Sequence, residues 1–575
     1  MYPYLIYYIP REKSSERCVN ERMNFVAFTS FMGYTEIYLR RRVNCRMEKS
    51  RKQTVGIVLI MVFMIVLTRR LTVTHNMELH ADEHVFFTAA QSLKGYISGS
   101  SPVYEEVKEY PEGAIVLQLP FHILTAIINR LTAANISPRL SGRIAAVFYF
   151  TVGAVLGCVV FHRFFSKKPF PLAVYAAVVV FSLIHIEQSR YGTGDAISFA
   201  LLMAVIFLTA SALTAEKHTF LRLLSAFFVC GVLCAVKYPL IYFSVIPIFG
   251  CIVLLHGQHG GRKAAVITAA VVLVYLGFAA VSPKAAFHSS YIIRASTREL
   301  GAYLGTGISR LTLLWINFMC VTTYSMLYSG LPLMPVFFVL GARRAWKESS
   351  AAPVELLFGR ILPVIIAVFF AYNLTASFLA MRSFYPFFFL TDLYAAAYIG
   401  SWLESVGAKR AAAYALTGIM VLRGIWLVAA LADSSDSKRM ADMLNRAVND
   451  GWNTTTILSG FMIYPDGLYG FPNVRVIDIR DERFSSPDTM RLHRGELFIA
   501  GARDHSISSF QFAFVPFDSI SGADEYAWVE FSEVNEEYCV GRLYPEYYYY
   551  LFGYWLRGTT GTSNEFPTCT IYYRG

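Results

Sequence analysis

The chain contains 575 residues, of which 55% are hydrophobic and 16% charged, and its mean hydropathy is +0.44. Soluble domains usually carry roughly a quarter charged residues, so this composition excludes an ordinary soluble protein and indicates one embedded in a membrane. The net charge of +11 does not indicate nucleic-acid binding, because the basic residues lie in short loops between apolar segments. The nine cysteines include no C-x-x-C pair and no zinc-ligand spacing.

Residues 1–46 form a basic N-terminal arm that contains Arg40-Arg41-Arg42 and lacks the apolar core of a signal peptide. Met47 begins the sequence MEKSRKQ directly before the first apolar segment, which makes it a more natural start. Two interpretations are open. The arm is either an upstream extension of the reading frame that is not translated, or a disordered segment in the cytoplasm.

Eleven apolar segments between 47 and 431 are predicted to cross the bilayer, whose core of about 30 Å needs roughly 20 helical residues. They are 53–72, 142–163, 170–187, 196–214, 219–236, 238–256, 263–282, 324–341, 356–377, 383–402 and 411–431. A further apolar run, 114–128, is ambiguous. Short cytoplasmic loops are enriched in Lys and Arg, and the basic loops share the cytoplasmic side only if 114–128 does not cross. We therefore predict that this helix dips into the outer leaflet.

The topology is that of an integral, multi-pass membrane protein. It places the unusual polar residues of this chain on one side of the membrane. The predicted outer face carries Asp82-Glu83, Asp195, Lys237, the 283–310 loop, Arg382 and the whole C-terminal tail. No internal repeat with inverted topology is evident, whereas paired broken helices would have indicated a secondary transporter.

The acidic pair Asp82-Glu83 follows the first span, at the membrane surface. Two carboxylates there cost solvation energy, which indicates a functional site. The sequence DEHVFFTAAQSLKGY then predicts an amphipathic helix of the kind that lies on a bilayer. Its apolar face contains Val85, Phe86, Ala89, Ala90 and Leu93. The sequence YPEGAIVLQLP follows at 110–120.

The whole unit resembles the first extracytoplasmic loop of the GT-C superfamily, the membrane glycosyltransferases that take a sugar from a polyprenyl-phosphate carrier. Protein O-mannosyltransferases and the aminoarabinose transferase of lipid A belong to it. The resemblance implies that Asp82, the first acidic residue of the loop, is the base for the acceptor hydroxyl. Glu83 is expected to orient the acceptor or the loop. Alternatively, Asp82 caps the helix that follows.

Tyr110-Pro111 matches the pattern that precedes the dipping helix in these families, and Pro111 suits a first helical turn. Pro-Pro is common there, but Glu112 replaces the second proline here, which leaves the role of that position open. The segment SRYGTGDAISF at 189–199 resembles the second acidic site of the superfamily. Asp195 would then bind a metal or line the sugar pocket, and a helix cap is the alternative.

Histidines surround the acidic pair, at His75, His80 and His84. Their irregular spacing favours ordinary interfacial residues over a metal site. No cofactor is therefore predicted with certainty, and a divalent metal at Asp195 stays open.

Lys237 in CAVKYP and Arg382 in MRSFYPFFFL match a Lys-Tyr and an Arg/Tyr/Pro signature of these families, and Tyr385 belongs to the second. Both cations suit a lipid phosphate, although Lys237 could simply snorkel. Arg294 and Arg298 lie in the predicted outer loop that begins at Ser282-Pro283 and are further candidates for the phosphate.

The tail, 432–575, is a separate domain by composition. It holds 12 Lys/Arg and 20 Asp/Glu, a charge of −8 that leaves +19 for the rest. Short strands at 454–458, 473–479 and 496–500 and a helix at 437–449 predict a small α/β fold. Tyr547-Tyr548-Tyr549-Tyr550 would stack on carbohydrate or pack on the membrane domain, and Cys539 and Cys569 could pair in an oxidising compartment.

These features predict an inverting membrane glycosyltransferase that uses a polyprenyl-phosphate-linked sugar. Its acceptor would be a lipid, glycan or protein on the outer face, and the sequence contains no Gly-rich loop for a sugar nucleotide. One alternative is a non-enzymatic lipid-carrier flippase or transporter, and another is an acyl or phosphoethanolamine-type transferase. A transporter is expected to keep polar groups at mid-membrane, whereas these polar groups gather at one surface.

Overall fold

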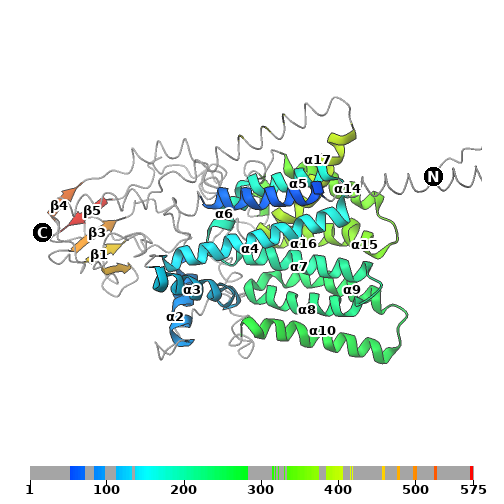
Figure 1. Ribbon diagram of the computed structural model, residues 1–575, viewed down its shortest axis with the longest axis horizontal. Coiled ribbons are helices and arrows are strands. Elements are labelled where there is room, and N and C mark those ends of the chain that lie inside the picture. The colour runs from blue at the N-terminus through cyan, green and yellow to red at the C-terminus, as the bar shows by residue number, and fades with distance from the viewer. Residues whose placement is uncertain are drawn as a thin grey trace, which may run out of the picture. The chain divides into compact units, whose positions relative to one another are not determined.

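The protein is described from a computed structural model (Figure 1). It describes residues 52–70, 83–97, 112–132, 136–282, 333–374 and 384–405, isolated positions within 314–329 and 415–422, and five strands between 456 and 573. The chain separates into two compact units, Met1–Gly56 and Ile57–Gly575, and the site described below lies wholly in the second.

The described part of the membrane domain is helical throughout. After the helix Lys52–Arg70 come α2 (Glu83–Ile97), α3 (Glu112–Thr132), α4 (Pro138–Val160), the π-helix η1 (Phe161–Phe165), α5 (Pro169–Phe181), α6 (Leu183–Arg190), α7 (Asp195–Thr214), α8 (Thr219–Val236), the 3-10 helix η2 (Tyr238–Ser244), α9 (Val245–Leu255) and α10 (Gly260–Val281). They are followed by α14 (Met334–Glu348), α15 (Pro353–Leu356), the π-helix η4 (Leu357–Ile361), α16 (Leu362–Leu374) and α17 (Tyr385–Ser405).

Eight helices of the described residues are long and apolar enough to cross a membrane, so the chain is an integral, multi-pass membrane protein. One of the eight is α3, and the other seven match predicted spans within a few residues. The predicted span at 383–402 corresponds to α17, and the second half of the one at 324–341 lies in α14. The last predicted span, 411–431, falls almost entirely outside the described residues.

The predicted span at 170–187 is wrong in one respect, because it is not a single helix. It breaks at Ser182, whose backbone is extended (φ −70°, ψ 125°), into the apolar α5 and the polar α6. Side-chain partners at the break replace the backbone hydrogen bonds that a continuous helix would make. Counting apolar residues does not reveal such a break.

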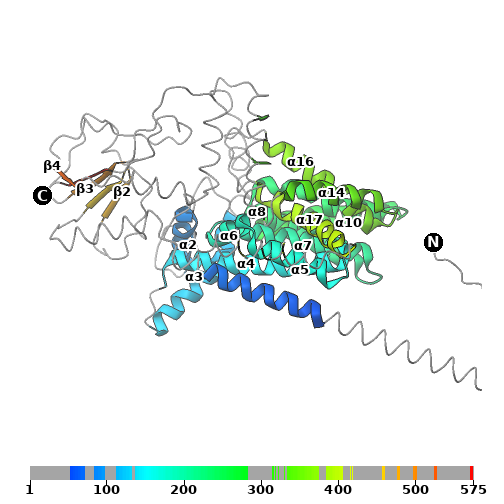
Figure 2. The ribbon, with the colours of Figure 1, turned by 90° about the horizontal axis from the view of Figure 1, so that it is seen from above.

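The long helices α4, α7, α8 and α10 run in a common direction, and α2 and α3 lie together at one end of them (Figures 1 and 2). Helix α2 runs across that direction. Helix α3 contacts the ends of α4 and α10, and also the middle of α4, where Tyr149 donates to the carbonyl of Leu117 over 3.0 Å. Thr125 donates to Ser141 in the first turn of α4, and Glu112 accepts from Ser282 directly after α10. By length and composition α3 could cross a membrane, and the dip into the outer leaflet stays a prediction.

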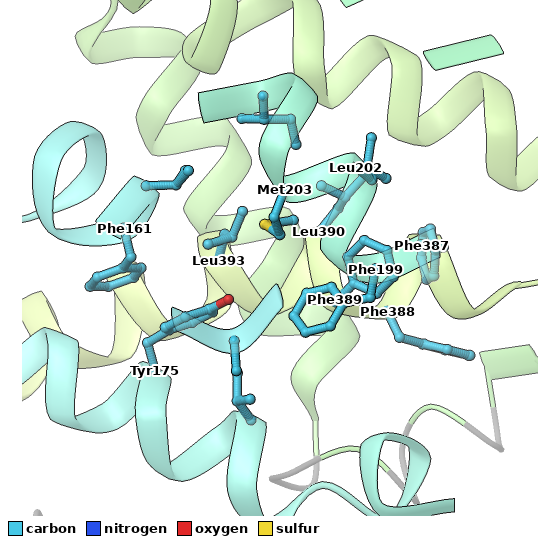
Figure 3. Close-up of a cluster of buried hydrophobic side chains, with 14 of the residues drawn as sticks. Phe161, Tyr175, Phe199, Leu202, Met203, Phe387, Phe388, Phe389, Leu390 and Leu393 are labelled. Atoms are coloured by element: carbon cyan, nitrogen blue, oxygen red, sulfur yellow. The ribbon is translucent and has the colours of Figure 1, made fainter. Parts of the chain in front are cut away.

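Aromatic and branched side chains form the core where α4, η1, α5, α7 and α17 meet (Figure 3). Phe161 stacks on Tyr175, with ring centroids 5.0 Å apart, and Phe199 of α7 lies 4.6 Å from Phe389 of α17. Elsewhere small residues bring backbones together. Gly231 of α8 faces the carbonyl of Val274, and Gly277 of α10 faces that of Phe228, with no room for a Cβ at either glycine.

The tail contains a five-stranded sheet in the order β2-β1-β3-β5-β4. Its strands are β1 (Thr456–Ser459), β2 (Arg475–Asp478), β3 (Glu496–Ala500), β4 (Asp524–Ala527) and β5 (Thr570–Tyr573). Strand β1 pairs in parallel with β2 and β3, and β5 is antiparallel to β3 and β4. All three predicted strands are present. The predicted helix at 437–449, the tyrosine run and the two cysteines lie outside the described residues.

Candidate functional site at the end of the helices

The structure joins two predicted site residues, Asp195 and Lys237, in an ion pair. Lys237 Nζ donates to Asp195 Oδ1 over 2.6 Å, and Thr193 Oγ1 donates to Asp195 Oδ2 over 3.0 Å. The Asp195 side chain is 6% exposed and the Lys237 side chain 19%. Both charges are therefore largely removed from solvent, and each depends on the other for compensation.

The local backbone explains why these two residues meet. Helix α8 ends at Val236, and Lys237 is extended (φ −154°, ψ 101°) before η2 begins. Its ammonium turns back to the carboxylate instead of snorkelling. Asp195 is the first residue of α7, and Gly194 is the N-cap, so Asp195 complements the helix dipole without being the cap.

Helix α3 packs directly on the turn that carries Asp195. Gln118 Nε2 donates to the carbonyl of Gly192 over 2.8 Å. A Cβ on Gly194 would lie 3.1 Å from Ala114 Cβ and 3.3 Å from Val236 Cγ1, so a side chain here would require its neighbours to shift by a few tenths of an ångström. The glycines of SRYGTGD thus allow α3 and α8 to approach the ion pair from two sides.

The helix that follows the acidic pair reaches the same place. Phe86, Ala89 and Ala90 of α2 are buried in one cluster with Ile197 and Val236, which flank Asp195 and Lys237 in sequence. The predicted apolar face is confirmed at these positions, but protein covers it instead of a bilayer. Glu83 is the first residue of α2, one helical turn before Phe86. Asp82 lies outside the described residues.

Glu112 stands where the resembled families often have a second proline. Its carboxylate accepts a hydrogen bond from Ser282 over 3.3 Å and thereby ties the first turn of α3 to the end of α10. This contact gives the acidic residue at position 112 a structural role.

A large apolar cavity is lined by Tyr238, the residue after Lys237. It has a volume of about 980 Å³ and is lined by residues of α8, η2, α9 and α10. Tyr238, which follows Lys237, and Phe278 line one end and stack with centroids 6.2 Å apart. His256 and Lys263 lie at the far end of the same helices. An apolar cavity that begins next to a lysine suits a ligand with an anionic head and a hydrocarbon tail.

A second polar group lies deeper in the protein and was missed by the sequence analysis. His185 Nε2 and Asp392 Oδ2 are 2.7 Å apart, with side chains 0% and 4% exposed. Tyr385 lies on the other side of the ring, its hydroxyl 3.3 Å from His185 Nδ1. Tyr385, predicted as a loop or pocket residue, is fully buried here. A lone Asp in the apolar run FFFLTDLYAAA was the available signal.

The fit of a divalent metal at Asp195 is poor. Both carboxylate oxygens already accept hydrogen bonds, and the ammonium of Lys237 occupies the place of a cation. Nowhere in the described part of the chain do three His, Cys, Asp or Glu gather closely enough to hold a metal. A metal here would need ligands from other residues and would have to displace Lys237.

Several predicted site residues lie outside the described residues: Asp82, Tyr110, Pro111, Arg294, Arg298 and Arg382. Two of them adjoin described elements of the site. Pro111 precedes α3, and Arg382 stands three residues before α17, which begins at Tyr385.

No protein-family model matches the chain, and no curated protein matches it. Among solved structures, the chain is similar to ArnT from Cupriavidus metallidurans bound to undecaprenyl phosphate. The identity is 11% and the TM-score 0.46, over 82% of this chain and 96% of that one. The apo structure of the same protein gives 11% and 0.45, over 79% and 94%. At this level of similarity no residue role passes from ArnT to this chain.

Proposed function

We propose that this protein is a membrane glycosyltransferase that moves one sugar from a polyprenyl-phosphate carrier to an acceptor on the outer face, with inversion. The observation that carries the proposal is the position of Lys237. It is a largely buried cation, bound by Asp195, and the next residue, Tyr238, lines a large apolar cavity. The helix that begins at Glu83 packs against Val236, the residue before Lys237.

The carrier would bind with its phosphate near Lys237 and its isoprenoid chain in the cavity. The lining of the cavity is almost wholly apolar, so it suits hydrocarbon and offers little to a hydrophilic ligand. Arg382, Arg294 and Arg298 are the proposed further donors to the phosphate. Arginine adds a planar fork of donors that a lysine lacks.

The proposed reaction needs one base and one electrostatic partner. Asp82 accepts the proton of the acceptor hydroxyl while the oxygen of that hydroxyl forms a bond to the anomeric carbon. The bond from that carbon to the phosphate oxygen breaks, and the phosphate leaves with the electron pair and one more negative charge. Cations near the phosphate therefore stabilise the transition state more than the bound donor. Glu83 would orient the acceptor, and Asp195 would hold Lys237 and face the sugar.

The test uses purified full-length protein in lipid nanodiscs with a panel of polyprenyl-phosphate sugars labelled in the sugar. Extracted membrane lipids, glycans and peptides serve as acceptors. We expect release of free polyprenyl phosphate and transfer of label with at least one donor, and neither with a sugar nucleotide. Failure of every donor to bind or react, in protein that remains folded, would contradict the proposal.

The buried pair of His185 and Asp392 favours a second candidate function, because ionisable residues inside a membrane often mark ion pathways. The gathering of the predicted polar groups at one surface argues against the alternative of a transporter, and this buried pair weakens that argument. A flippase would move the lipid carrier from one leaflet of a vesicle membrane to the other without altering it chemically. Accessibility of a labelled carrier headgroup in reconstituted vesicles distinguishes movement from transfer.

A further inference from the structure

The break between α5 and α6 is filled by one buried side chain, Arg69 at the end of the first span. Its guanidinium donates to the carbonyls of Val180 over 2.7 Å and Val179 over 3.4 Å. These carbonyls belong to the last turn of α5, where a helix leaves its carbonyls without intrahelical partners and its dipole is negative. Arg69 Nε also donates to Ser189 Oγ in α6 over 3.0 Å.

A second set of bonds ties α6 to α17. His185 of α6 lies between Tyr385 and Asp392 of α17, 3.3 Å from the hydroxyl and 2.7 Å from the carboxylate. In one consistent assignment, the Tyr385 hydroxyl donates a hydrogen bond to Nδ1 of His185, and the N–H at Nε2 donates to the carboxylate of Asp392. Phe150 and Phe199 lie around the imidazole, with centroids 5.8 and 6.2 Å away, and leave little room for water.

Burying a guanidinium, an imidazole and a carboxylate costs free energy that apolar side chains would not cost. Their presence is better explained by the single arrangement of the helices that their hydrogen bonds specify than by a gain in stability. The network joins three segments that are distant in sequence, since His185 and Asp392 are 207 positions apart.

Both elements that it joins lead directly into the proposed site. Helix α6 ends at Arg190, and the next residues form the turn to Asp195. Helix α17 starts at Tyr385, three residues after Arg382. We infer that Arg69, His185, Tyr385 and Asp392 are positioning residues that hold the Asp195 turn and the start of α17 in register with each other. This inference rests on the proposed function only where it concerns turnover.

The test compares the same substitution at two positions of α17. Tyr385→Phe removes the hydroxyl beside His185. Tyr394→Phe removes a hydroxyl of equal burial, which donates to the carbonyl of Phe358 over 2.6 Å, outside the network. We expect Tyr385→Phe to lower kcat/KM about tenfold, because small misplacements of a site are costly. Tyr394→Phe should stay within about twofold of wild type, although both variants lose one buried hydrogen bond.

Hydrogen–deuterium exchange gives a readout that does not require activity. Tyr385→Phe should speed exchange of the amides at 189–195, and Tyr394→Phe should leave it unchanged. Equal exchange in the two variants overturns the inference whether or not the protein transfers sugar. Faster exchange without any transferase activity would uphold the positioning role and count against the proposed function alone. Equal losses of kcat/KM in the two variants would reduce the network to ordinary packing.

Discussion

At the scale of single residues, the site combines groups that the sequence points to with partners that it conceals. Lys237 and Asp195 were each predicted from their own surroundings, but their pairing over 2.6 Å was not. The approach depends on where α7 begins and α8 ends, which no local pattern in the sequence specifies. His185 and Asp392 were missed for the same reason, because a buried ion pair is recognisable only when both partners are known.

Asp82→Asn should abolish sugar transfer, with a loss on the order of a hundredfold or more. Asparagine caps a helix about as well as aspartate does but cannot accept the acceptor's proton. The substitution therefore separates the base from the cap. Initial rates with a labelled donor measure the effect, and Asp436→Asn in the tail is the control. Activity within a few-fold of wild type would leave Asp82 with the capping role alone.

Lys237→Met should destabilise the protein by about 1–3 kcal/mol, because the carboxylate of Asp195 would stay buried without its cation. Adding Asp195→Asn removes that charge, so the double variant should recover much of the lost stability. It should not recover transfer, since the cation for the phosphate is gone. Thermal unfolding and turnover of the single and double variants measure both effects. Recovery of turnover in the double variant would show that Lys237 serves only the ion pair.

At the scale of the elements, hydrophobicity located the helices because the thickness of the bilayer sets their length. It could not reveal the break at Ser182, since the backbone groups of the break are satisfied by Arg69, a residue of another span. It also misjudged what covers α2. An apolar helix face looks the same in sequence whether lipid or protein lies against it.

Gly277→Ala should destabilise the protein by about 1–3 kcal/mol, because overpacking forces the backbones of α8 and α10 apart. The added Cβ would meet the carbonyl of Phe228. Gly261→Ala in the same helix is the matched control, since nothing lies within 4 Å of its Cβ position. The unfolding temperatures of the two variants in one detergent give the comparison. Equal unfolding temperatures would mean that α8 and α10 do not depend on this close approach.

At the scale of the whole molecule, the charges of the loops predict which side faces outward. If α3 does not cross, residues 100 and 563 lie on the same outer face. Single cysteines at Ser100 and Ser563, in a chain whose native cysteines are replaced by serine, should both react with a membrane-impermeant maleimide added to intact cells. Lys409→Cys should react only after the membrane is opened. Reaction of Ser100→Cys without Ser563→Cys, or the reverse, would refute this topology.

The cavity lined by Tyr238 is open on its lateral side. Ile241, Ile252, Ile267 and Val271 line it and are 57%, 66%, 52% and 65% exposed, so in a membrane this wall faces lipid. A carrier would then enter sideways, and its effective concentration would be its mole fraction among lipids. Diluting the donor with inert phospholipid at fixed total concentration should slow transfer in proportion below saturation. The free carrier would leave by the same lateral route, so it should accumulate as an inhibitor in a small closed patch of bilayer and disperse in a large one.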